Sequence, residues 1–185
     1  MSASSYYGRY TCCEDAAQAA YQELSSPGIP IPLLPVLKRC GVQPVLSSSL
    51  TQGAAGCLYL HEGRWYMALR SGTPVDEQRL SIAEEMGHLL LGHPMCGGQI
   101  RCFDRSLSGP RQASERFAVR FLIPACQLPE GPLSPDFLAG RFVVPRLFLL
   151  SHLSLLTLDR ERARTGTNPG KPHTMETESP DTVPG

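Results

Sequence analysis

Apolar residues recur with two different periods along the chain, and the change of period predicts its elements. Near both ends they return every three or four residues, as on one face of an α-helix. This pattern predicts helices over residues 15–24, 33–40, 76–93, 111–123, 136–141 and 145–158. Between the second and third helices lie three short runs rich in strand-forming residues, at 42–46, 56–60 and 64–69. A Glu-Gly turn at 62–63 joins the last two runs into a hairpin. We therefore expect an α+β domain with a small antiparallel sheet and a C-terminal helix pair.

The composition of the two ends sets the expected domain boundaries. Residues 1–14 are small, polar and aromatic, which predicts a flexible lead-in before a domain over 15–159. The C-terminal helix pair closes that domain at 136–158. Residues 160–185 contain only three apolar residues, Ala163, Met175 and Val183, and cannot bury enough surface to offset the loss of conformational entropy. We expect this tail to be disordered.

Composition and charge narrow the class of protein. Hydrophobic residues make up 42% of the chain, which suits a globular core, and 17 basic and 17 acidic residues cancel. The chain therefore has no global attraction for nucleic acid or for an anionic membrane. The most apolar window, 142–158, is broken by Pro145, Arg146 and His152 and is shorter than the roughly 20 residues that a bilayer needs, so we expect a buried helix. Seven cysteines without a framework spacing, and no secretory signal, predict reduced thiols in the cytoplasm.

The predicted helix 76–93 carries the polar residues best suited to chemistry. Glu84 and His88 are four residues apart and share one face of the helix, with Glu85 at its border. In the zinc-binding pattern H-E-x-x-H, two histidines at this spacing hold the metal and the glutamate activates a water. Here Glu84 stands at the first histidine position. The apolar residues around the triplet predict a buried helix, in which acids need a partner or a metal. Without that burial, such a triplet is typical of a solvated helix face.

Residues 79–93, which read RLSIAEEMGHLLLGH, resemble the motif R-F-T-x-A-H-E-L-G-H-L-L-L-H of the ImmA/IrrE metallopeptidase family. The hairpin at 56–69 corresponds to the small sheet of that family. Residues 115–124 are similar to its A-N-x-F-A-A-x-L-L-M-P helix, and residues 138–147 resemble the helix-turn-helix-like pair that follows. The resemblance covers residues 15–158.

The resemblance implies a zincin-like zinc endopeptidase of the cytoplasm. Members of the family act on helix-turn-helix repressors in prophage, mobile-element or stress circuits. Carried over by position, Glu85 matches the general base and His88 the second histidine ligand, while Glu84 stands in the place of the first. The third ligand of the family is an acid shortly before the Phe-Ala pair, and the first acid available here is Glu115. The expected Zn²⁺ ligands are therefore His88, Glu84 and Glu115.

Two departures on the metal ligands leave other interpretations open. Arg111 could form an ion pair with Glu84 or Glu85 in place of the metal, which would make the chain a pseudoenzyme that binds a protein partner without cutting it. His93 follows His88 by five residues, so we expect it to point away from the ligand face and to favour the helix dipole. Cys96 and Cys102 are weaker zinc candidates because their spacing is not that of a tight C-x-x-C site. The terminal helices carry too few basic residues to predict direct nucleic-acid binding.

Overall fold

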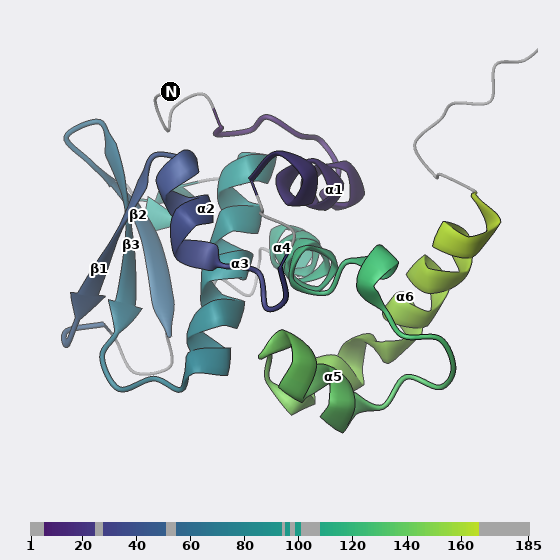
Figure 1. The fold of residues 1–185 in the computed structure, drawn as a ribbon. Helices are drawn as coiled ribbons and strands as arrows, with labels where there is room; N and C mark the ends of the chain where they lie inside the picture. The colour runs from purple at the N-terminus through teal and green to yellow at the C-terminus, as the bar shows by residue number, and fades with distance from the viewer. Residues whose placement is uncertain are drawn as a thin grey trace, which may run out of the picture.

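The computed structural model describes residues 6–24, 28–50, 55–93, 95–96, 99–100 and 108–166. Over these residues it confirms an α+β fold in which helices flank a small sheet (Figure 1). The sheet lies at one side, α3 and α4 form the centre, and α6 lies at the side away from the sheet. The elements are α1 (Cys13–Leu24), α2 (Leu33–Arg39), β1 (Val42–Ser47), β2 (Gly56–His61), β3 (Arg64–Arg70), α3 (Val75–Leu91), β4 (Met95–Cys96), β5 (Gln99–Ile100), α4 (Ser108–Leu122), the 3₁₀ turn η3 (Ala125–Gln127), α5 (Pro135–Phe142) and α6 (Arg146–Thr165).

The sheet is mixed, and the expectation of an antiparallel sheet is wrong at one edge. Its strand order is β1-β3-β2-β5-β4, and the predicted β2–β3 hairpin is antiparallel, with Glu62 and Gly63 at positive φ in its turn. β1 lies beside β3 and runs parallel to it. The periodicity of a strand does not say which neighbour it will pair with. Pro44 within β1 is the one sequence signal of an edge position, because proline cannot donate to a central ladder.

Helix α3 lies between the sheet and α4. Its first turn carries Asp76 and Glu77, which favour the positive end of the helix dipole, and it ends at Gly92 in the left-handed conformation. At Gly87 the two helix backbones approach closely, since a Cβ there would lie 3.1 Å from the Cα of Ser114 and 3.0 Å from the ring of Phe117. The core between these layers consists of large buried side chains, among them Leu37, Leu58, Met67, Met86, Leu89, Phe117, Phe121 and Phe142.

Residues 6–12, which we expected to belong to a flexible lead-in, pack against the end of α3. The amides of Gly8 and Tyr10 donate to the carbonyls of Leu89 and Leu90, each over 3.0 Å. These carbonyls lie in the last turn of the helix, where the regular i to i+4 hydrogen bonds end. The ring of Tyr7 stacks on Trp65, with 5.8 Å between the ring centroids. The segment therefore closes the C-terminal end of α3.

Arg79 ties α3 to the segment before α2 and to the turn between α5 and α6. Its Nη1 donates to the carbonyl of Ile31 over 2.9 Å, and its Nε donates to the carbonyl of Val143 over 3.1 Å. Its Nη2 also lies 3.5 Å from the carbonyl of Phe142. One partly buried guanidinium thus connects α3 to the residues just before α2 and to the turn between α5 and α6.

Helices α5 and α6 form the predicted C-terminal pair, bent by 108° across residues 143–145. The expectation that the apolar window 142–158 is a buried helix is wrong in part, because Leu147, Leu150 and Leu158 of α6 are exposed. α6 continues to Thr165, so its last residues lie beyond the domain end expected at 159, and residues 167–185 lie outside the described part. Among the described residues no single helix is long and apolar enough to cross a membrane, although α5 and α6 together meet the length and composition of a bent span.

Candidate functional site

Glu84 lies on α3 and interacts electrostatically with Glu115 and Arg111 of α4. Burial and the nearby carboxylate of Glu115 raise the pKa of Glu84 to about 7, and Arg111 acts in the opposite direction. The protonated carboxyl is therefore favoured at pH values at which an exposed glutamate is ionised. A protonated carboxyl offers zinc much less than a carboxylate does, since a metal ligand must first lose its proton.

Glu115 is held by Arg111. The guanidinium Nε of Arg111 donates to Oε1 of Glu115 over 2.9 Å, one helical turn away on α4. The sequence left open whether Arg111 would pair with Glu84 or Glu85. The ion pair shown in the structure is with Glu115, the residue expected to replace the third zinc ligand.

Glu85, the predicted general base, faces the sheet. Its side chain is 6% exposed, and its Oε2 accepts a hydrogen bond from the backbone amide of Leu58 on β2 over 3.3 Å. Adjacent residues on a helix point about 100° apart, so Glu84 and Glu85 face different elements. The three residues of the E-E-x-x-H pattern are all on α3, and the backbone amide of Leu58 on β2 is one partner of Glu85.

His88 is 2% exposed and pairs with His93. Their Nδ1 atoms are 2.7 Å apart, so one ring donates a hydrogen to the other, and the rings meet edge to face. Burial, with a smaller contribution from His93, lowers the pKa of His88 to about 3, and burial also lowers the pKa of His93. Both rings are therefore neutral at physiological pH. The expectation that His93 points away from the ligand face is wrong, because its ring contacts His88 of that face.

The position of His93 follows from Gly92. Gly92 has φ +66, which ends the helix and reverses the chain, so helical spacing no longer applies to the next residue. Tyr7 holds the backbone of His93 in this position by donating its hydroxyl hydrogen to the His93 carbonyl over 2.9 Å. The glycine was visible in the sequence, but the direction of the following side chain was not.

The described residues do not fit the expected zinc set. Within the described ranges, no group of three or more histidine, cysteine, aspartate or glutamate side chains is placed to hold a metal ion. Glu85, His88 and Glu115 each have a hydrogen-bond partner within the protein, and the pKa of Glu84 is raised. The side chain of Cys96 and the whole of Cys102 lie outside the described residues, so their candidacy stays a prediction. The described cysteines at 12, 13, 40 and 126 are free thiols.

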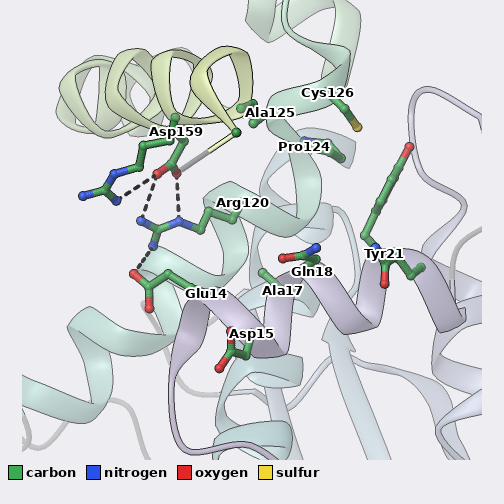
Figure 2. A pocket seen from close by; sticks show the side chains of 14 residues that line it. Glu14, Asp15, Ala17, Gln18, Tyr21, Arg120, Pro124, Ala125, Cys126 and Asp159 are labelled. Carbon is green, nitrogen blue, oxygen red and sulfur yellow. Dashed lines mark hydrogen bonds and ion pairs between the residues drawn. The ribbon is translucent and has the colours of Figure 1, made fainter. Parts of the chain in front are cut away.

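A second candidate site, not anticipated from the sequence, is a groove of about 430 Å³ between α1, the end of α4 and the end of α6. Figure 2 shows Arg120 at its base, between Glu14 on α1 and Asp159 on α6. Its Nη1 lies 2.9 Å from Oε1 of Glu14, and its Nε lies 2.8 Å from Oδ2 of Asp159. Burial raises the pKa of Glu14, but the Cys13 thiol and Arg120 outweigh it, and the net pKa is lowered. The guanidinium is thus neutralised by acids of the chain, which gives the network a structural role in joining three helices.

Comparison of the chain with models of protein families, with curated proteins and with solved structures finds no match in any of the three.

Proposed function

We propose that the chain is a non-catalytic relative of the ImmA/IrrE metallopeptidases that works as a protein-binding module in a cytoplasmic regulatory circuit. The proposal combines the sequence resemblance of residues 79–93 and 115–124 with the arrangement of their side chains. The order of elements supports a zincin-like origin, with a small sheet, the helix of the E-E-x-x-H pattern, and a second helix packed against it.

The observation that carries the proposal is the pairing of the residues that would form the metal site. Arg111 holds Glu115 at 2.9 Å, and His88 shares a hydrogen bond with His93 at 2.7 Å. A zinc site needs its ligands deprotonated and directed at one point, at about 2.0–2.2 Å from the metal. Arg111 places a cation beside Glu115, the residue expected to supply the third ligand, and a neighbouring cation disfavours metal binding there.

The partner that the resemblance suggests is a helix-turn-helix repressor of a prophage, mobile-element or stress circuit. Such a partner would be bound intact. The test is to incubate the purified chain with a panel of helix-turn-helix repressors and to follow both complex formation and the intact mass of each repressor. Binding of a repressor at unchanged mass supports the proposal, whereas a zinc-dependent cut contradicts it and restores the metallopeptidase alternative.

Zinc content tests the pairing directly. The full chain, purified without a chelator or a histidine tag, is expected to contain much less than one zinc per molecule by elemental analysis. Glu84→His supplies a neutral imidazole, and Arg111→Gln removes the cation and frees Glu115. We expect the double variant to bind zinc at least about tenfold more tightly than Glu84→His alone, and a further Glu115→Gln change to reverse that gain.

A matched control separates a specific effect from a general loss of positive charge. Arg116→Gln removes an exposed arginine from the same helix and should leave zinc affinity unchanged in the Glu84→His background. Stoichiometric zinc in the wild-type chain would contradict the proposed loss of the site. Equal zinc affinity with and without Arg111 would show that the Arg111–Glu115 pair does not block the metal.

A further inference from the structure

The sheet turns one face towards its helices and the other face away from them. Helices α2 and α3 pack against the strands from one side (Figure 1), where Leu58, Trp65 and Met67 are buried. Side chains alternate between the two faces of a strand, so the residues between these point the other way. The strand registers align them across the sheet: Gln43, Val45 and Ser47 of β1, Arg64, Tyr66, Ala68 and Arg70 of β3, and Cys57, Tyr59 and His61 of β2. We call this set the outer sheet face.

Two tyrosines lie side by side at the centre of the outer sheet face. Tyr59 and Tyr66 are directly opposite each other on antiparallel strands, and their ring centroids are 5.3 Å apart with 15° between the ring planes. His61 adds a third ring, tilted, whose centroid lies 6.5 Å from that of Tyr66. A cross-strand aromatic pair stabilises a hairpin by itself. Both tyrosines are also partly exposed, and rings at the surface of a sheet offer flat faces on which nucleobases stack.

A hollow of about 430 Å³ adjoins Tyr59 on the same face. Two of its lining residues, Cys57 and Ala68, are small and lie opposite each other on β2 and β3, which leaves room beside the tyrosine ring. Leu46 and Ser47 at the end of β1 also line the hollow and add an apolar group and a hydroxyl. The volume is within the range of small-ligand sites. Aromatic, apolar and hydroxyl groups around a space of this size suit one flat heterocyclic base.

The part of the chain that builds this face is basic. Residues 28–72 contain four lysines and arginines, at 38, 39, 64 and 70, and a single acid, Glu62. Arg64 and Arg70 lie at the two ends of β3, about 20 Å apart along the strand, on either side of the tyrosine pair. Glu62 lies in the hairpin turn, with its Oε1 3.9 Å from Nε2 of His61. The chain as a whole is neutral, so this concentration of positive charge favours an anionic partner at the sheet.

We propose that the outer sheet face binds single-stranded nucleic acid. One base occupies the hollow beside Tyr59, its neighbour stacks on the tyrosine pair, and the phosphates lie against Arg64 and Arg70. Nucleic acid combines negative charge with flat rings, whereas an acidic peptide supplies only the charge. A single strand is required because the faces of its bases are free to stack on side chains. The proposal uses none of the metal-site residues, so its failure and that of the proposed function are distinguishable.

Fluorescence anisotropy of labelled oligouridylate and oligodeoxyuridylate, each about 12 nucleotides long, measures binding to the full chain. Both are expected to bind at low salt. Tyr59→Ala removes the ring that borders the hollow and forms the pair, and should weaken binding about 10- to 100-fold, as for the loss of one stacked base. Tyr59→Phe is the matched control, because it keeps the ring and should bind as the wild type does.

The arginines give a test that leaves the aromatic pair intact. Arg64 is exposed, so Arg64→Gln should keep the fold while it removes one phosphate contact. Logarithmic affinity falls with logarithmic salt concentration, and the loss of one contact should make that slope shallower by about 0.7. Arg116→Gln removes an exposed arginine from α4, which α3 separates from the sheet, and should leave both affinity and slope unchanged.

Failure of both oligonucleotides to bind at low salt overturns the proposal, as does binding that Tyr59→Ala and Arg64→Gln leave unchanged. Equal affinity for a duplex of the same length also overturns it, since a duplex buries the faces of its bases in its own stack. Displacement by polyglutamate at the same concentration of charge would assign the face to an acidic protein segment and overturn the proposal. The two oligonucleotides differ only in the 2′-hydroxyl, so a difference in their affinities supports the proposal and identifies RNA or DNA as the preferred strand.

Discussion

Replacing Gly92 by alanine tests how the N-terminal segment and the end of α3 hold each other. Gly92 has φ +66, a conformation that costs a residue with a Cβ about 1–2 kcal/mol. The added Cβ would also lie 2.7 Å from the Cα of Gly8, which is closer than real Cβ contacts allow. The atom it meets is backbone, so the segment around Gly8 must move as a whole. Overpacking of this kind costs about 1–3 kcal/mol.

The two effects together predict that Gly92→Ala lowers the free energy of unfolding by about 2–5 kcal/mol. Gly72→Ala is the matched control. Gly72 has φ +79 but nothing within 4 Å of its missing Cβ, so this variant carries the conformational cost alone. Both changes reduce the entropy of the unfolded chain equally, and that contribution cancels in the comparison. The excess cost of Gly92→Ala over Gly72→Ala measures the close approach to Gly8.

Urea unfolding followed by tryptophan fluorescence measures both variants. Trp65 is the only tryptophan in the chain, and it stacks on Tyr7, one residue before Gly8. The native fluorescence of Gly92→Ala should therefore also change, because the displaced segment carries Tyr7 with it. If the two variants lose equal stability within about 0.5 kcal/mol, the contact between Gly8 and Gly92 contributes nothing, and the reasoning from packing is refuted.

Two further predictions concern α3. Because the pKa of Glu84 is raised from 4.5 to about 7, the folded state keeps a proton that the unfolded state loses, and stability falls as the pH rises from 4.5 to 7. Glu84→Gln should therefore be more stable than wild type by roughly 1–3 kcal/mol at pH 8 and no more stable at pH 4, and urea unfolding at both pH values checks this. The opposite contribution of His88, whose lowered pKa makes stability rise from pH 3 to 6.5, is common to both proteins, and an equal gain at both pH values would refute the role of Glu84. Arg79→Gln should cost about 2–4 kcal/mol through its lost bonds to backbone carbonyls, whereas the exposed Arg64→Gln should cost almost nothing in the same assay.

The local elements could be predicted from the sequence because their causes are local. The helical periods and the Glu-Gly turn at 62–63 predicted elements that differ from the observed ones by a few residues at most, apart from the extension of α6 to Thr165. A hydrophobic period reports which face of an element is buried.

What the period does not report is the identity of each partner. Strand β1 has the same alternation whether it pairs with β2 or with β3, so its parallel pairing was decided by how the whole sheet assembles. The aromatic residues at 6, 7 and 10 suggested a loose segment because they belong to no periodic run. Their role appears only when the carbonyls of the last turn of α3 are brought beside them.

The same limit applies to the candidate site. The sequence identified Glu84, Glu85, His88 and Glu115 as candidate site residues on two helices. It also placed a cation, Arg111, near the expected metal ligands. Whether these side chains would meet at one point depended on directions that differ by about 100° between neighbours on a helix. In the folded chain Glu85 accepts a hydrogen bond from β2, and the charges of Arg111 and Glu115 on α4 act on Glu84. The left-handed Gly92 reverses the chain, so that His93 contacts His88. The sequence therefore identified the candidate residues, and contacts between segments far apart in the chain decided the partners of their side chains.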